Sequence, residues 1–165
     1  MLQVSRRADY ATRIMITLGL QEGGTCLSAR VVSQRASVPK AFLHKITADL
    51  VKANLVRTFV GPAGGLALAR PAAQINMLQI MEATDGPVCL NRCMLRPGEC
   101  HRDLICPAHD FWGRLQAEIV RQLREARLDL LVSEARDLIQ HPRRRQNVPY
   151  LVPEQHIEVI SSDGQ

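Results

Sequence analysis

The sequence has few aromatic residues and lacks long apolar runs. Phe, Trp and Tyr make up only 4% of the 165 residues, although hydrophobic residues make up 46%. Such a chain can bury a core of aliphatic side chains, which favours helices and excludes a disordered protein overall. No apolar run approaches about 18 residues, and the N-terminus lacks the apolar stretch of a secretory signal. We therefore expect a cytoplasmic protein with one compact domain and an appendage.

Acidic residues are scarce in the first third of the chain. The net charge is +5, and residues 1–57 hold nine Lys and Arg against three Asp and Glu. The later segments are close to neutral. This distribution indicates a module that binds a polyanion, joined to a neutral part, although a solvated basic face would have the same charge.

The spacing of apolar residues predicts a chain of helices and one hairpin. The predicted helices are 5–21, a short helix after Ser28, 40–53, 73–84 and 110–139, and the predicted strands are 55–60 and 66–69. Gly23 and Gly24 should end the first helix, and Ser28 should cap the second. Pro39 suits the first position of the third helix, and Asn54 its C-cap.

This order of elements is that of a winged helix-turn-helix, mostly α with a small β-hairpin. A helix fits the major groove of DNA with its N-terminal residues at the base edges, and a glycine-rich hairpin tip lets the backbone approach phosphates. Winged helices that bind proteins remain an alternative. The residues expected to contact DNA are Ser28, Ser37, Lys40, Ala41, His44, Lys45, Arg57, Gly61, Gly64 and Gly65.

The predicted helix over 110–139 has an apolar seam with the three-and-four spacing of a coiled coil. Its members are Trp112, Leu115, Ile119, Leu123, Ala126 and Leu130. A small domain cannot bury such a seam alone, which favours a homodimer through residues 110–140 over packing within one chain. The residues from 141 to 165 are expected to form a flexible tail.

Residues 88–109 hold four of the five cysteines and break the helical pattern. Their order, Cys93-x6-Cys100-x5-Cys106-x2-His109, brings three thiolates and an imidazole together, which suits zinc or an iron–sulfur cluster. The spacings differ from those of zinc knuckles and ribbons. Structural disulfides are not expected in the cytoplasm. The chain shows no nucleophile–base arrangement, phosphate loop or carboxylate pair, so we do not expect an enzyme.

Four features together resemble the Rrf-type bacterial regulators, the family of the IscR, NsrR and RirA type. They are Asp9-Tyr-Ala, the segment 38–46 in the third helix, the segment 61–66 in the wing, and the triple-cysteine loop before a long helix. The resemblance covers about residues 1–140. It implies a dimeric winged-helix transcription factor, a repressor, whose iron–sulfur cluster sets its DNA affinity in response to iron, redox state or nitric oxide.

The resemblance also implies the ligands. Cys93, Cys100 and Cys106 would hold a cluster, with 2Fe–2S favoured over 4Fe–4S, and the fourth ligand would be His109 or Asp9 of the partner subunit, with His109 favoured. The first spacing is one residue longer than in the family, and Cys89 is additional. A cluster-free regulator is the alternative, switched by zinc or by oxidation of Cys89 and Cys93. The expected domains are 1–84 (DNA binding), 85–109 (cluster loop), 110–140 (dimerisation) and 141–165 (tail).

Overall fold

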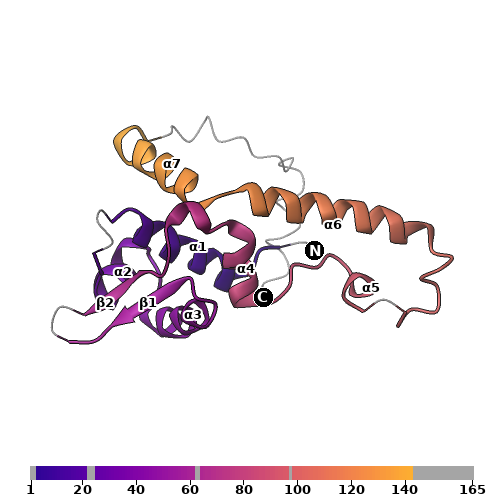
Figure 1. Ribbon diagram of the computed structural model, residues 1–165, viewed down its shortest axis with the longest axis horizontal. Coiled ribbons are helices and arrows are strands. Elements are labelled where there is room, and N and C mark those ends of the chain that lie inside the picture. Colours follow the sequence, from indigo (N-terminus) through magenta and orange to yellow (C-terminus); the bar gives the residue numbers. More distant parts are fainter. Residues whose placement is uncertain (1–2, 22–24, 62–63, 97, 143–165) are drawn as a thin grey trace, which may run out of the picture.

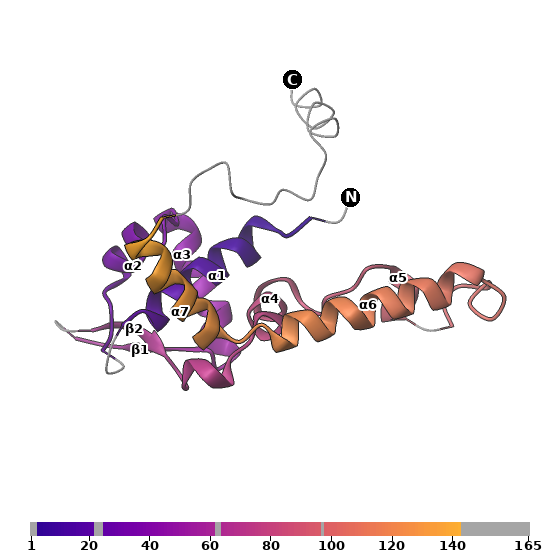
Figure 2. The same cartoon turned by 90° about the horizontal axis from the view of Figure 1, so that it is seen from above.

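The computed structural model describes residues 3–21, 25–61, 64–96 and 98–142. Its elements are α1 (Arg6–Gly19), α2 (Ala29–Arg35), α3 (Lys40–Lys52), β1 (Val56–Phe59), β2 (Gly65–Leu68), a 3-10 helix η2 (Ala72–Gln74), α4 (Met77–Asp85), α5 (Arg92–Leu95), α6 (Pro107–Glu125) and α7 (Leu128–Gln140). Helices α1 to α3, the hairpin and α7 gather at one end of an elongated molecule (Figures 1 and 2). Helix α6 extends away from them and carries α5 and the cysteine loop.

The first three helices begin and end where short-range chemistry dictates. The Ser5 side chain accepts a hydrogen bond from the Ala8 amide (3.0 Å) and caps α1, and Ser28 caps α2 in the same way, as predicted. Pro39 precedes α3 instead of occupying its first position. The C-cap of α3 is Ala53 and not Asn54, which follows it with φ of 55°, the left-handed conformation that ends many helices.

The helix-turn-helix and the wing share one aliphatic core. The turn between α2 and α3 is closed by hydrogen bonds from the Val38 amide to the Ser33 carbonyl (3.0 Å) and from the Ser33 hydroxyl to the Val38 carbonyl (2.8 Å). Strands β1 and β2 pair antiparallel, with Val56 opposite Leu68. The buried hydrophobic side chains of α1, α2, α3 and the hairpin are Ala8, Ala11, Ile14, Met15, Leu18, Val32, Leu43, Ile46, Leu50, Val56, Leu66 and Ala67. The predicted winged-helix fold, mostly α with a small hairpin, is confirmed.

The helix predicted over 73–84 begins later than its apolar pattern suggested. Residues 72–74 form η2, and α4 starts after Asn76. The Asn76 side chain accepts a hydrogen bond from the Gln79 amide (3.0 Å), and the Gln79 side chain accepts one from the Asn76 amide (3.1 Å). This reciprocal capping box fixes the start of the helix. Gly86, with φ of 80°, is the C-cap of this helix.

The single helix predicted over 110–139 is instead two helices, α6 and α7, separated at Ala126 and Arg127. The Leu128 amide donates to the Ile75 carbonyl (2.8 Å), and the Met77 amide donates to the Ala126 carbonyl (3.0 Å). These bonds turn the chain back toward the winged-helix core. The break is therefore explained by backbone pairing with residues 75–77 at the start of α4, and no local sequence signal predicts this pairing.

Helix α7 packs against α1 of the same chain. Leu128 and Val132 belong to the hydrophobic core, so the chain-internal alternative is correct for this part of the segment. The contact is close, because a Cβ added to Gly19 at the end of α1 would lie 2.5 Å from Cγ2 of Val132. Of the seam residues, Ala126 lies in the break and Leu130 is exposed.

Three expectations fall wholly or largely outside the described residues: the stop at Gly23 and Gly24, part of the wing tip, and residues 143–165 of the tail. The segment 88–109 is a loop as predicted, except that it contains α5 and the first turn of α6. Within the described part of the chain, no helix combines the length and apolarity needed to cross a membrane.

Candidate metal centre and nucleic-acid interface

All four ligands proposed from the cysteine loop line one cavity, of about 390 Å³. Cys93 lies in α5, Cys100 in the following turn, Cys106 immediately before α6, and His109 in the first turn of α6. The structure therefore brings together side chains from three consecutive pieces of backbone. Helix α6 supplies the rigid side of the cavity, and Pro107 at its first position favours helix initiation there.

Asp103 also lines this cavity, although the cysteine pattern did not predict it as a ligand. One ligand atom from each of Cys93, Asp103 and His109 lies within 4.8 Å of the others. The His109 Nδ1 atom is 3.7 Å from Oδ1 of Asp103. This His109 Nδ1 atom is buried and has no hydrogen-bond partner among the described residues. An unsatisfied imidazole nitrogen in a thiol-lined cavity fits a metal-binding group, and the only sequence signal was a carboxylate between two cysteines.

Hydrogen bonds from the body of α6 hold the chain that leads into the loop. The Gln116 side chain accepts a bond from the Leu90 amide (2.8 Å) and donates one to the Val88 carbonyl (3.0 Å). This pair of bonds fixes residues 88–90 along α6. The loop between α4 and α6 is thus anchored beside α5, just before the first proposed ligand.

The remaining candidates from the sequence do not line the cavity in this single chain. Asp9 lies in the first turn of α1, where its carboxylate pairs with Arg13 at 2.7 Å. The Cys89 thiol donates to the Asn91 carbonyl at 2.9 Å. A role for Asp9 as a ligand would therefore require a partner subunit.

The residues expected to contact DNA lie on α2, α3, the turn between them, and the hairpin, at the end opposite the cysteine loop (Figure 1). The exposed members are Ser28, Ser37, Lys40, Ala41, His44, Lys45, Arg57 and Gly61. Pro39 provides no side-chain cap for α3, so the first amides of α3 receive no bond from a capping side chain. The N-terminus of the helix carries positive partial charge, which attracts phosphates.

Gly64 and Gly65 have a packing role within the hairpin. A Cβ on Gly65 would lie 2.3 Å from the Leu27 carbonyl oxygen, and one on Gly64 would lie 2.4 Å from the Phe59 carbonyl oxygen. Leu27 pairs with Leu66 through two backbone hydrogen bonds, so the backbones meet closely here. Of the three described glycines of the wing, Gly61 alone is exposed with open space around it, and its φ of 115° favours glycine.

Helix α6 is amphipathic. The seam side chains Trp112, Leu115, Ile119 and Leu123 are half-buried. On the exposed face, Arg121 forms hydrogen bonds with Glu118 and Glu125. The bond from Arg121 lowers the pKa of the Glu118 carboxyl to about 2. The helix therefore has one charged, self-paired face and one apolar stripe.

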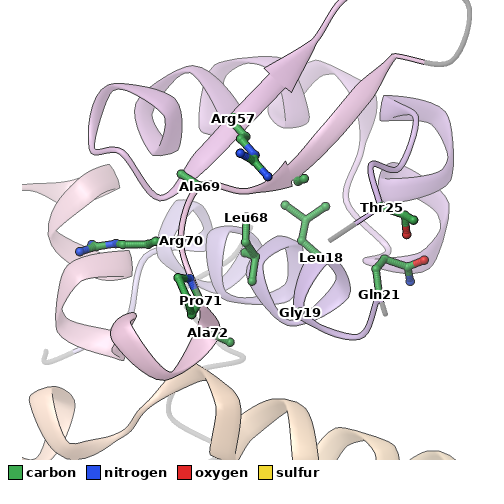
Figure 3. Close-up of a pocket in the computed structure, with 11 residues that line it drawn as sticks. Leu18, Gly19, Gln21, Thr25, Arg57, Leu68, Ala69, Arg70, Pro71 and Ala72 are labelled. Carbon is green, nitrogen blue, oxygen red and sulfur yellow. The ribbon is translucent and has the colours of Figure 1, made fainter. Parts of the chain in front are cut away.

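A second cavity, of about 400 Å³, lies between the end of α1, β2 and residues 69–72 (Figure 3). Arg57 and Leu18 extend toward each other across it, whereas Arg70 points away. Among its described lining residues there is no Cys, His or acidic side chain. Its chemistry therefore does not suit a metal, and the cysteine-lined cavity is the candidate metal centre.

The fold, with a basic recognition helix and a wing on one face, defines a DNA-binding transcriptional regulator of the winged-helix class. The model of one family, described as Rrf2, iron-dependent transcriptional regulator, matches residues 4–134. The chain belongs to the Rrf2 family of transcriptional regulators. The family and the relatives it contains are regulators, not enzymes.

Relatives and solved structures of this family match most of the chain. A Neisseria meningitidis protein named as a candidate HTH-type transcriptional regulator is 30% identical over 135 residues, which cover 81% of this chain and 89% of its own. IscR of Vibrio vulnificus is 26% identical, and the match covers 81% of this chain and 79% of that protein. The structure of CymR, the global cysteine regulator of B. subtilis, has a TM-score of 0.68 at 22% identity, and the match covers 81% of this chain and 98% of CymR. The structure of T. potens IscR has a TM-score of 0.67 at 22% identity, and the match covers 89% of this chain and 97% of that IscR. These two structures show the same fold.

Proposed function

We propose that this regulator is a repressor whose DNA affinity depends on an iron–sulfur cluster held by Cys93, Cys100, Cys106 and His109, with 2Fe–2S favoured over 4Fe–4S. The observation that carries the proposal is the convergence of these four side chains on one cavity. The buried, unsatisfied Nδ1 of His109 supports it. The description of the family as iron-dependent, and the relative named IscR, agree with this choice.

In the proposed switch, the bound cluster would hold three segments of the chain together. Cys93, Cys100 and the pair Cys106 and His109 belong to α5, the turn and the start of α6. When bound, a cluster would supply a link between these ligands that oxidation, iron loss or nitric oxide can remove. Once the cluster is lost, α5 and the turn are free to separate from the N-terminus of α6. The loop then no longer fixes the position of that helix end.

Helix α6 connects the cavity to the DNA-binding part. Its C-terminal end is hydrogen-bonded to the start of α4 through Met77 and Ala126. A change in the orientation of α6 would therefore alter how two copies are spaced. Half-site spacing matters because both recognition helices of a dimer must enter the major groove together. In this proposal residues 1–84 bind DNA, 85–109 hold the cluster, and α6 within 110–140 forms the dimer.

DNA recognition is assigned to the N-terminus of α3 and the wing. Lys40, His44 and Lys45 are exposed there, where a helix meets base edges in the major groove. Arg57 and Gly61 of the hairpin would contact the flanking phosphates. The local positive charge supplies the sequence-independent part of the affinity.

The dimer is assigned to the apolar stripe of α6. No α6 side chain among the described residues is fully buried in one chain, although four large apolar side chains line the stripe. Ile119→Glu should split the dimer or weaken it by several kcal/mol, because a charge would be buried at the interface. Arg124→Glu, on the same helix and exposed, is the matched control. Light scattering that shows equal dimer populations for the two variants would exclude this stripe as the interface.

The cluster assignment is tested by anaerobic reconstitution with iron and sulfide, followed by visible absorbance, circular dichroism and DNA binding. The wild-type protein should become brown or red and change its DNA affinity. His109→Ala should alter the cluster spectrum, whereas Asp9→Ala should leave it unchanged. The reverse pattern would place the fourth ligand in the partner subunit. A protein that stays colourless would instead favour the zinc or thiol switch.

A further inference from the structure

We propose that Cys93, Asp103 and His109 form a site for a single divalent transition-metal ion in the cluster-free protein, with Asp103 as a direct ligand. The site uses two residues of the proposed cluster centre and in that respect rests on the proposed function. It adds a carboxylate ligand and a different occupant of the cavity. The three side chains come from the turn between α5 and α6 and from these two helices.

The separation of Asp103 and His109 is that of two ligands sharing an ion. The Oδ1–Nδ1 distance of 3.7 Å is too long for a hydrogen bond, which spans about 2.7–3.2 Å. Two ligands at about 2.1 Å from a tetrahedral metal lie about 3.4 Å from each other. The ligand atom of Cys93 completes a group within 4.8 Å. One metal ion can therefore contact all three after small side-chain adjustments.

Asp103 differs from the other carboxylates that form ion pairs in the described chain. Its side chain is 13% exposed, whereas the carboxylates of the other described ion pairs are 31–59% exposed. The low exposure of the Asp103 side chain needs an explanation, because removing a carboxylate from water is costly when no cation compensates its charge. The buried Nδ1 of His109, which has no hydrogen-bond partner in the described residues, faces the same problem. A shared cation would satisfy both groups.

The backbone orients Asp103 for this role. Its Oδ2 atom accepts a hydrogen bond from the Gly98 amide at 2.8 Å, and its own amide donates to the Cys100 carbonyl at 3.0 Å. The first bond leaves Oδ1 directed toward His109. Fixing one carboxylate oxygen while the other binds metal is the usual function of outer-shell partners.

The donor set selects the class of ion. One thiolate, one imidazole and one carboxylate suit Zn²⁺, Fe²⁺ or Co²⁺, whereas Mg²⁺ and Ca²⁺ prefer oxygen donors alone. Three protein ligands leave a fourth position for water or for another ligand on the cavity wall. The site and the cluster would exclude each other, because they share Cys93 and His109.

The test is a cobalt titration of the full-length, cluster-free protein under anaerobic conditions. Co²⁺ bound by the wild type should give visible d–d bands and a thiolate-to-cobalt charge-transfer band. Asp103→Asn keeps the size and the acceptor for Gly98 but removes the charge, so it should bind Co²⁺ at least about tenfold more weakly and shift the d–d bands. Glu99→Gln, an exposed carboxylate of the same loop paired with Arg96, is the matched control and should behave as the wild type.

Two results of the cobalt titration would overturn the proposal. An Asp103→Asn spectrum with unchanged bands, whether or not the affinity falls, would exclude Asp103 as a ligand, provided far-ultraviolet circular dichroism shows a folded variant. A wild type that binds no Co²⁺ would exclude the site itself. Cys100→Ser separates the two proposals, since it should lose the cluster and retain Co²⁺. Failure to assemble any cluster would leave the cobalt result unaffected.

Discussion

The substitution Leu128→Ala tests whether α7 belongs to the core of its own chain. Leu128 is fully buried, whereas Leu130, two residues later in the same helix, is 58% exposed. Burying a Leu side chain contributes about 1.5–3 kcal/mol, and the cavity left by truncation raises the cost of a core Leu→Ala change to about 2–5 kcal/mol. Leu130→Ala should cost less than about 1 kcal/mol, because more than half of that side chain is already in water.

The free energy of unfolding is measured by urea denaturation, followed by far-ultraviolet circular dichroism. Both variants and the wild type are compared at the same protein concentration, and again after tenfold dilution, because dimer formation would add to the apparent stability. We expect Leu128→Ala to lower the urea midpoint clearly at both concentrations. In thermal unfolding, each kcal/mol lost from the free energy of unfolding should lower the melting temperature by about 2–4 °C in a chain of this size.

Equal losses for the two variants, or a larger loss for Leu130→Ala, would refute the packing of α7 described above. That result would favour the continuous helix with Leu130 in its seam. A Leu130→Ala loss that shrinks on dilution would place Leu130 in an interface between subunits, because the dimer then contributes less to the stability of both proteins. Only the predicted asymmetry supports an α7 whose buried face is provided by α1.

Three further predictions concern DNA binding, the wing and α6. Lys40→Ala should reduce the slope of log affinity against log salt by about 0.9, because one phosphate contact is lost, whereas Lys52→Ala at the other end of α3 should leave it unchanged; equal slopes would place the DNA surface elsewhere. Gly65→Ala should destabilise the fold by about 1–3 kcal/mol, since its Cβ would lie 2.3 Å from the Leu27 carbonyl oxygen. Gly113→Ala, whose Cβ would lie 3.9 Å from a Met94 sulfur, should be neutral or stabilising by up to about 1 kcal/mol in calorimetry.

Much of the fold was predictable because local chemistry determines it. Apolar spacing located the cores of α1, α3 and α4, and the Ser28 hydroxyl identified the start of α2. The glycine-rich turn identified the hairpin. The cysteine spacing singled out the loop that forms the cavity, because few other roles bring several thiols and an imidazole together. These signals act over a few residues and are therefore visible in the sequence.

The tertiary structure alone decided the features that depend on distant partners. The break after α6 arises from bonds to Ile75 and Met77, about fifty residues earlier in the chain. Because an apolar stripe continues through that break, periodicity could not separate α6 from α7. Asp103 becomes a candidate ligand only because the turn places it 3.7 Å from His109. Sequence patterns indicate which side chains are suited to burial or to metal binding, but the tertiary fold determines which of these groups come into contact.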